Sequence, residues 1–142
     1  MKILVLGGSG MLGNAMFRIM SETTETYATF RSAAAAQHFS SNLQCRIVSG
    51  VDVLDQDSLV ELFGRLRPDV VVNCVGLVKQ LAESEDPLIV LPINAILPHR
   101  LARLCSLTGA RLVHVSTDCV FKGTKGNYLE TDVSDATDLY GK

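Results

Sequence analysis

Hydrophobic residues along this chain alternate between two patterns, short continuous runs and stripes at helical spacing. A short run bounded by turn residues indicates a buried strand, and apolar residues three or four positions apart indicate an amphipathic helix. The runs that we predict to be strands are residues 3–6, 27–30, 45–48, 70–72 and 112–115. The stripes that we predict to be helices are residues 11–19, 32–39, 59–66 and 86–108.

Signals for helix ends accompany two of these stripes. Ser58 and Glu61 have the spacing of a capping box, which predicts that the third helix begins there. Gly109 is placed to end the long fourth helix. Pro92 and Pro98 should start or kink that helix, so its first residue stays open. Residues 122–138 are polar and contain glycines, so we expect a loop.

The alternation of strands and helices predicts an α/β fold of the Rossmann type. Its doubly wound parallel sheet would carry helices on both faces, joined by right-handed crossovers. The 142 residues fit one domain. Because such sheets bind ligands at the carboxyl ends of their strands, the residues that follow each strand are the candidates for function.

A glycine-rich turn follows the first predicted strand directly. Gly7 would allow the tight turn, Gly10 would let the backbone approach a phosphate, and Gly13 would let the helix pack closely on its strand. Backbone N–H groups and the positive end of a helix dipole suit a dinucleotide pyrophosphate. The alternative is an ordinary turn between a strand and a helix. The cofactor contacts predicted here are Gly7, Ser9, Gly10, Met11, Leu12 and Gly13.

Arg31 follows the second predicted strand, where many dinucleotide sites carry an Asp or Glu for the ribose 2′-hydroxyl. A guanidinium instead suits a 2′-phosphate, through paired and charge-assisted hydrogen bonds. The position therefore favours NADP(H) over NAD(H). The alternative is an ordinary surface arginine.

Three further groups of residues follow the remaining strands. Asp52 and Val53 come after the third strand, where the carboxylate could accept a hydrogen bond from an adenine amino group or could form a turn. The segment Asn73, Cys74 and Val75 follows the fourth strand and would let a cofactor pass close to the backbone. Ser116-Thr117-Asp118 follows the fifth strand, and its hydroxyls could form a turn or bind a substrate oxygen.

Composition narrows the class of protein. Hydrophobic residues make up 47% and charged residues 20% of the chain, which is typical of a globular protein. A net charge of −2 predicts neither nucleic-acid nor membrane binding, and the uninterrupted apolar stretches are shorter than the roughly 20 residues that span a bilayer. The N-terminus lacks a signal-peptide pattern, so we expect a cytoplasmic protein. The four cysteines and three histidines lack metal-ligand spacing, so no metal is predicted.

Several segments together resemble the extended short-chain dehydrogenase/reductase superfamily, and within it the dTDP-4-dehydrorhamnose reductase group of nucleotide-sugar reductases. The matching segments are spread over the whole chain, and the Ser-Thr-Asp-x-Val-Phe-x-Gly segment with its downstream Tyr-Gly is the most specific. They are residues 7–13, 67–73, 82–85, 94–95, 109–118, 120–123 and 140–141. Cys119 and the segment 73–76 depart from the usual residues of the group, which leaves the substrate side open.

The resemblance implies a catalytic hydroxyl at Thr117, a catalytic tyrosine at Tyr140 and a lysine four residues after the tyrosine. In that chemistry a hydride reaches a ketone carbon while the developing alkoxide takes a proton and a hydrogen bond. A free tyrosine has a pKa of about 10, and a lysine at i+4 would favour its phenolate. That lysine would be residue 144, beyond Lys142, and Lys142 itself should lie on another face.

We therefore interpret residues 1–142 as an NADP(H)-binding domain that stops before the catalytic lysine and a C-terminal substrate-binding portion. The parent would be an NADPH-dependent reductase of a 4-keto nucleotide sugar, serving polysaccharide precursor synthesis, and this portion alone should be nearly inactive. The alternatives are a nucleotide-sugar epimerase or dehydratase, and a non-catalytic NADP(H)-binding regulatory subunit. Apolar surface left exposed at the sheet would favour self-association, for example as a homodimer, or disorder after about Phe121.

Overall fold

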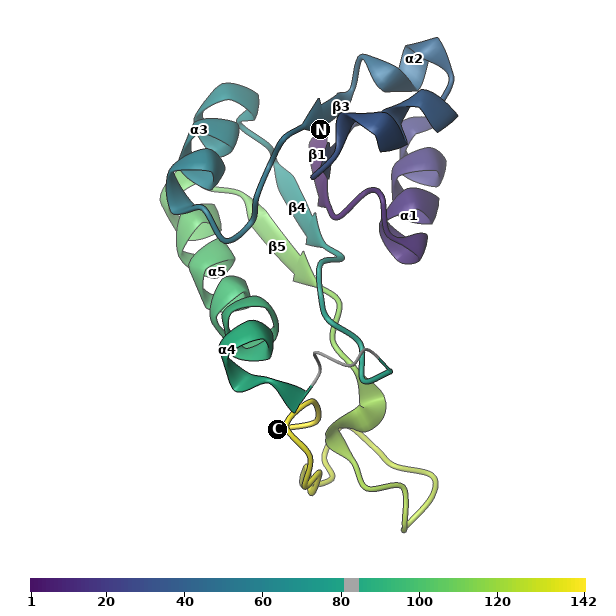
Figure 1. Ribbon diagram of the computed structural model, residues 1–142, viewed down its shortest axis with the longest axis vertical. Coiled ribbons are helices and arrows are strands. Elements are labelled where there is room, and N and C mark those ends of the chain that lie inside the picture. Colours follow the sequence, from purple (N-terminus) through teal and green to yellow (C-terminus); the bar gives the residue numbers. More distant parts are fainter. Residues whose placement is uncertain (81–84) are drawn as a thin grey trace.

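The computed structural model of the chain describes residues 1–80 and 85–142. Its centre is a parallel sheet with the strand order β3-β2-β1-β4-β5, which confirms the predicted Rossmann-type fold (Figure 1). The strands are β1 (Lys2–Leu6), β2 (Glu25–Phe30), β3 (Ile47–Ser49), β4 (Val70–Asn73) and β5 (Arg111–His114). From β1 the strands are added first on one side (β2, then β3) and afterwards on the other side (β4, then β5). The switch point of the sheet therefore lies at the carboxyl ends of β1 and its neighbours β2 and β4.

Helices cover the sheet on two sides, as Figure 1 shows for α1 on one side and α3 with α5 on the other. The helical elements are α1 (Met11–Ser21), the 3₁₀ helix η1 (Ala33–His38), α2 (Ser41–Gln44), α3 (Gln56–Leu66), α4 (Pro87–Val90), the π-helix η3 (Leu91–Ile96), α5 (Leu97–Thr108) and the 3₁₀ helix η4 (Asp118–Val120). Segment 32–39 is thus a 3₁₀ helix, and the short helix α2 lacked a sequence signal.

Two apolar clusters hold these layers together. On the side of α3 and α5, Leu4, Leu62 and Leu101 are buried in one cluster. On the side of α1, Phe17 and Phe30 are buried in the other, where the rings of both pack against the ring of Phe39. The alternation of side chains along β1 explains this division, because successive residues of a strand point to opposite faces.

Helix α3 begins about one turn before the predicted start. Asp55 is its N-cap, and the Asp55 carboxylate accepts a hydrogen bond from the N–H of Asp57 at 3.0 Å. The capping box predicted at Ser58 and Glu61 is therefore wrong, because both residues already lie inside the helix. Asp satisfies the free N–H groups of a first turn as well as Ser does, and the apolar stripe alone did not distinguish the two starts.

Helices α4, η3 and α5 form one continuous helical segment from Pro87 to Thr108. Pro92 lies in the π-helical part, and Pro98 lies just after it in α5, so the change of helix type accompanies the two residues that cannot donate a backbone hydrogen bond. Gly109 ends the segment in a left-handed conformation with a φ of 76°, as predicted.

This segment has 22 residues, and a window of 18 residues within it has a mean hydropathy of 1.3, which by length and composition would suffice to cross a bilayer. The helix itself was predicted at residues 86–108, but polar residues interrupt its apolar stretches, so none of them reaches the length of a bilayer span. Leu97, Leu101 and Cys105 are buried where the helix packs against the sheet. Core helices of soluble proteins pass the same test, so one such helix is weak evidence of a membrane span.

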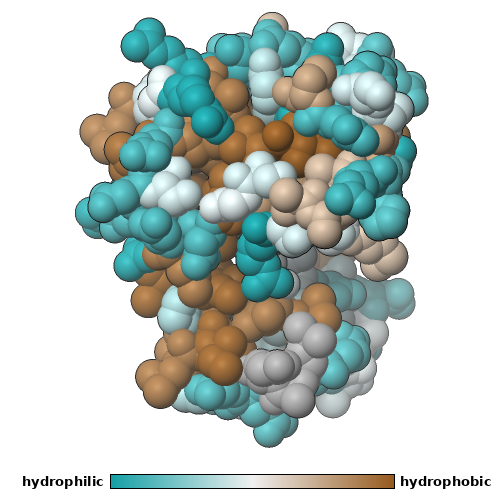
Figure 2. Space-filling model, turned by 45° about the horizontal axis from the view of Figure 1, so that its top comes forward, coloured by the Kyte–Doolittle hydropathy of each residue, from teal (hydrophilic) through white to brown (hydrophobic). Residues whose placement is uncertain are grey.

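Apolar side chains also reach the surface, and Figure 2 shows them gathered in a band across one face. At the carboxyl edge of the sheet, Met11 is 93% exposed, and Leu12 is 44% exposed. On the edge strand β5 and just beyond it, Val113 and Val115 are both 41% exposed. The described chain thus leaves apolar surface uncovered beside its switch point.

Candidate active site

The glycine turn after β1 has the conformation that the sequence predicted. Gly7 has a φ of 82°, a left-handed conformation that side chains disfavour, and its carbonyl accepts a hydrogen bond from the N–H of Gly10 at 3.0 Å. A Cβ atom on Gly13 would collide with the carbonyl oxygen of Gly7. The missing side chain of Gly13 therefore lets α1 start directly on the turn.

Gly8 contributes a contact that the sequence analysis did not identify. A Cβ atom there would lie 2.5 Å from Cε1 of Phe30 and 2.7 Å from the Cβ of Ala28, both in β2. The Gly8 N–H also donates to the carbonyl of Thr29 at 3.0 Å. Gly8 thus packs the turn flat against the neighbouring strand, and the small Ala28 with the aromatic Phe30 two positions later in β2 was the available signal.

Helix α1 presents its N-terminus at this turn. Its N-cap, Gly10, has no side chain to satisfy the free N–H groups of the first turn. The first helical hydrogen bond runs from the N–H of Asn14 to the carbonyl of Gly10 at 2.8 Å. The N–H groups of Met11, Leu12 and Gly13 precede that bond and lack helical acceptors, which is the donor set that an anionic ligand needs.

The end of β4 is held by the buried side chain of Asn73. Its Oδ1 accepts from the N–H of Val75 at 3.1 Å, and its Nδ2 lies 3.1 Å from Nδ1 of His114 in β5. Because the Asn73 oxygen already has a donor, the amide nitrogen must donate to His114, whose Nδ1 is then unprotonated. Burial lowers the pKa of His114, which also favours the neutral ring.

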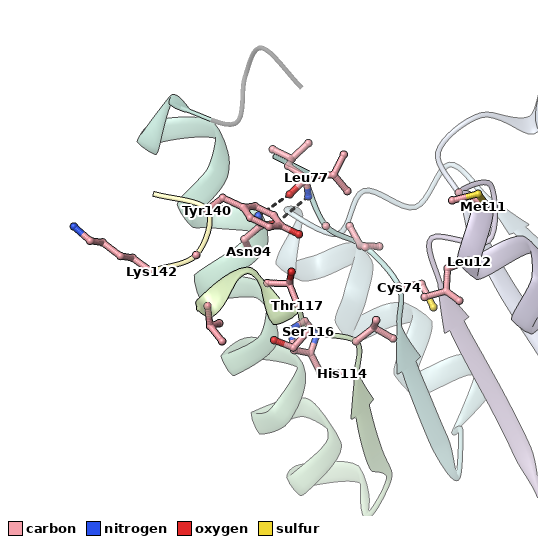
Figure 3. A pocket seen from close by; sticks show the side chains of 17 residues that line it. Met11, Leu12, Cys74, Leu77, Asn94, His114, Ser116, Thr117, Tyr140 and Lys142 are labelled. Carbon is pink, nitrogen blue, oxygen red and sulfur yellow. Dashed lines mark hydrogen bonds between the residues drawn. The ribbon is translucent and has the colours of Figure 1, made fainter. Parts of the chain in front are cut away.

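Asn94 fixes the segment that follows β4. It projects from η3, and its side-chain amide donates to the carbonyl of Leu77 at 2.9 Å while its Oδ1 accepts from the N–H of Leu77, also at 2.9 Å. The pair of bonds is drawn in Figure 3. Sequence reasoning gave Asn94 no role, although an amide between two prolines in an apolar helix was the available signal.

These elements surround a cavity of about 500 Å³ at the carboxyl end of the sheet. Its walls come from the start of α1, the segment after β4, the helix η3, the end of β5 and the last residues of the chain. Predicted site residues in its lining are Gly10, Met11, Leu12, Cys74, Val75, Thr117 and Tyr140. Figure 3 shows Thr117 and Tyr140 on the same side of the cavity, close to Asn94, with Leu12 and Cys74 at the other end.

Thr117 and Cys74 have well-defined surroundings in this cavity. The Thr117 hydroxyl accepts a hydrogen bond from the N–H of Cys119 at 3.1 Å, which caps η4 and orients the hydroxyl oxygen. Burial raises the pKa of the Cys74 thiol, so that side chain is a neutral, weakly polar part of the wall. The cavity thus combines an oriented hydroxyl, a phenol and a largely apolar wall.

The other predicted site residues lie outside the cavity lining. Ser9 and Arg31 are exposed, and Asp52 accepts a hydrogen bond from the N–H of Leu54 at 2.9 Å, which is the turn-forming alternative of the sequence analysis. Asn73 is buried and acts on Val75 and His114. The residues outside the lining are Gly7, Ser9, Gly13, Arg31, Asp52, Val53 and Asn73.

Lys142 lies at the rim of the cavity, and its side chain points away from Tyr140 in Figure 3. The spacing predicted that Lys142 lies on another face than Tyr140, and its ammonium is accordingly directed away from the phenol. Among the described residues, no cluster of three or more His, Cys, Asp or Glu side chains could hold a metal ion. The site offers the free N–H groups of α1 and the glycine turn at one end and the hydroxyls of Thr117 and Tyr140 at the other. This arrangement fits a dinucleotide that extends along the carboxyl edge of the sheet.

Comparison with known proteins places this geometry in a family. A family model described as "RmlD substrate binding domain" matches residues 1–142. Methionine adenosyltransferase 2 subunit beta of Xenopus laevis is 26% identical over 99% of this chain and 40% of that protein. A dTDP-4-dehydrorhamnose reductase of Streptomyces griseus is 30% identical over 97% of this chain and 40% of that protein.

A solved structure, a hypothetical dTDP-4-dehydrorhamnose reductase from Sulfolobus tokodaii, superposes with a TM-score of 0.83 at 28% identity, covering 99% of this chain and 48% of the other. The chain therefore spans less than half the length of each of these proteins. Because the family model covers residues 1–142, and the motifs and fold agree with it, this protein belongs to the RmlD substrate binding domain family, an extended short-chain dehydrogenase/reductase group.

Proposed function

We propose that this chain is the NADPH-binding part of a longer polypeptide that reduces the 4-keto group of a nucleotide sugar. The observation that carries the proposal is a shared cavity, lined by the helix start after the glycine turn and by Thr117 and Tyr140. A cofactor bound along the turn would bring its reactive end toward those two hydroxyls. The similarity to dTDP-4-dehydrorhamnose reductases supports the substrate class.

NADPH, when bound, supplies the hydride that converts the ketone carbon to an alcohol carbon. Tyr140 donates its phenolic proton to the ketone oxygen as negative charge develops there. The Thr117 hydroxyl donates a hydrogen bond to the same oxygen, while its own oxygen accepts from the Cys119 N–H. The apolar residues around Cys74 keep water from the reacting carbon.

The cofactor part of this proposal is tested by titrating the chain with NADPH and with NADH. Arg31 lies at the carboxyl end of β2, next to the glycine turn, and would bind the 2′-phosphate. We expect Arg31→Ala to weaken NADPH binding by about tenfold or more and to leave NADH binding unchanged, because a charge-assisted hydrogen bond contributes about 1.5–3 kcal/mol. Arg103→Ala, an exposed arginine of α5, is the control. Tighter binding of NADH by the unaltered chain would contradict the assignment.

The catalytic part requires the longer polypeptide, assayed by NADPH oxidation with 4-keto nucleotide sugars. Tyr140→Phe should lower kcat by about 10²- to 10⁴-fold with little change in NADPH affinity, since it removes only the proton donor. If the unaltered protein oxidises NADPH with none of these sugars, the reductase proposal is wrong.

A second candidate is a non-catalytic subunit of a larger assembly. The similarity to a protein named as a subunit of methionine adenosyltransferase favours it. The two candidates differ in the Tyr140→Phe experiment, because a subunit without chemistry would keep its cofactor affinity and its function in that variant. An epimerase or dehydratase would instead convert the sugar without net consumption of NADPH.

A further inference from the structure

The carboxylate of Asp138 helps to hold the segment that carries Tyr140. Asp138 accepts a hydrogen bond through Oδ1 from the N–H of Gly141 at 2.8 Å, and its carbonyl accepts from the N–H of Lys142 at 3.2 Å. These bonds close a turn around Tyr140. Gly141 is buried, and a Cβ atom on it would lie 2.5 Å from the Cβ of Ala136. The turn is therefore packed closely against the preceding loop at Gly141.

The same carboxylate also contacts the segment that follows β4. Its Oδ2 accepts a hydrogen bond from Nζ of Lys79 at 2.7 Å, and Lys79 lies in the segment after β4. That segment lies beside Tyr140 at the same end of the cavity, where Asn94 holds Leu77 by two hydrogen bonds. A chain of polar contacts thus runs from η3 through the β4 segment and Asp138 to the turn around Tyr140.

Both partners of this ion pair are charged in the folded protein. The hydrogen bond from Lys79 lowers the pKa of Asp138, and the N–H of Gly141 lowers it further. The hydrogen bond to Asp138 raises the pKa of Lys79. Both side chains are exposed to solvent, so the pair should add little to global stability. The ion pair should instead act locally, by fixing the turn around Tyr140 relative to the segment that follows β4.

We propose that Lys79 and Asp138 form a clasp that positions Tyr140 in the cavity. Asp138 orients the turn, and Lys79 ties that turn to the segment that follows β4. Both are positioning residues that act through Tyr140. The geometric part of this inference is independent of the proposed function, and its consequence for cofactor binding rests on that function.

The chain contains a second lysine–aspartate pair that serves as a matched control. Lys125 donates to Oδ1 of Asp132 at 2.5 Å, and Oδ2 of Asp132 accepts from the N–H of Leu129 at 2.8 Å. The chemistry is the same as in the clasp, including one backbone N–H donor. Both residues lie within the loop before Asp138 and outside the cavity lining. Disrupting this pair should therefore leave Tyr140 in place.

The test is ¹⁹F NMR of the whole chain labelled with 3-fluorotyrosine. The chain has three tyrosines, Tyr27, Tyr128 and Tyr140, and Tyr140→Phe assigns the resonance of interest. We expect Lys79→Met and Asp138→Asn each to move the Tyr140 resonance toward that of free fluorotyrosine. Asn still caps a turn, so Asp138→Asn removes the charge and keeps the backbone bond. The double variant should resemble either single one.

Rescue and control variants separate positioning from general loosening. Lys79→Arg should retain the original Tyr140 resonance, since it keeps the charge and the donor. Lys125→Met should move only the resonance of Tyr128, whose ring lies near Lys125. Urea-unfolding midpoints of all these variants should agree with that of the unaltered chain. A Tyr140 resonance that is unchanged in both Lys79→Met and Asp138→Asn would overturn the clasp.

NADPH titration of the same variants distinguishes the clasp from the proposed function. Opening the clasp displaces the whole Tyr140 ring, whereas Tyr140→Phe removes only its hydroxyl. If the clasp is closed in most molecules of the unaltered chain and open in most molecules of Lys79→Met, the Kd should rise by roughly three- to tenfold, and Lys125→Met should stay within about twofold. Failure of the unaltered chain to bind NADPH would count against the proposed function alone, and the ¹⁹F result would still decide the clasp. Equal Kd values for Lys79→Met and the unaltered chain would overturn the coupling to the cofactor.

Discussion

The glycines of the first turn act in different ways at the scale of single residues. Gly7 is needed for its positive φ, Gly8 for its contact with the ring of Phe30, and Gly13 for the approach of α1 to the carbonyl of Gly7. A glycine motif in the sequence does not distinguish a conformational need from a packing need. The two predict different results on substitution.

Gly13→Ala should destabilise the protein, because the new methyl group would collide with backbone that has no free space to move into. We expect a loss of about 1–3 kcal/mol in the free energy of unfolding, measured by urea denaturation, and weaker NADPH binding. Gly64→Ala is the matched control, since Gly64 lies inside α3 with open space around its Cα. That change should be neutral or stabilising by about 0.5–1 kcal/mol. Equal effects at both sites would contradict this account.

His114 predicts a pH dependence of stability. Its pKa is lowered in the folded protein by burial, so the unfolded chain takes up a proton first as the pH falls. The contribution of neutral His114 to the free energy of unfolding is therefore complete above the ordinary histidine pKa of about 6.5. It is lost as the pH falls toward the lowered pKa of the folded protein. The free energy of unfolding, measured in urea, should differ less between pH 7.5 and pH 5.5 for His114→Gln than for the unaltered chain. His99→Gln, on the exposed side of α5, should keep the full difference.

At the scale of elements, helix boundaries are decided by caps that the apolar stripe does not specify. The stripe in α3 begins at Leu59, yet the helix begins at Gln56, because the Asp55 carboxylate caps it. The long helix likewise begins after Asp86, whose carboxylate accepts from the N–H of Leu88 at 2.9 Å. In both helices an aspartate sets the start of the element, ahead of its first buried residue.

Asp55→Ala should therefore destabilise the protein by about 1 kcal/mol, within the range of roughly 0.5–2 kcal/mol for a lost N-cap. Ser58→Ala should have little effect, since Ser58 lies inside the helix. Both variants are compared by urea denaturation followed by circular dichroism. A larger loss in Ser58→Ala than in Asp55→Ala would restore the capping box that the sequence predicted.

At the scale of the whole molecule, β5 is an edge strand with an incompletely covered face. Val113 lies beside Val72 of β4, on the side of the sheet where α1 packs. Within the described residues, Figure 1 shows no helix over β4 and β5 on that side. An exposed apolar strand at a sheet edge is a surface on which a second polypeptide segment can pair or pack.

We expect the isolated chain to self-associate through this edge. Val113→Lys should weaken that association, because a lysine on an edge strand opposes pairing with another copy. Leu107→Lys is the control, since Leu107 is 84% exposed on α5, away from the edge strand. Sedimentation velocity at several concentrations measures the effect. A monomer at all concentrations, or equal weakening by both variants, would contradict this expectation.

Local physics made much of this molecule predictable from its sequence. Strands and helices followed from the spacing of apolar residues, and the turn after β1 followed from glycines whose conformation and packing other residues cannot adopt. These properties depend on residues within a few positions of one another. The same reasoning correctly placed the left-handed end of α5 at Gly109. It missed α2 and the cap at Asp55, where several polar residues compete at close positions.

The cavity, by contrast, depends on contacts between residues far apart in the sequence. Asn73 meets His114, Asn94 holds Leu77, and Lys79 reaches Asp138 only after the strands have paired and the helices have packed. Sequence alone therefore determined the elements and the kinds of side chain that follow each strand. Only the tertiary structure decided which of those side chains share a cavity and which serve as supports, because chain folding sets the distances between them.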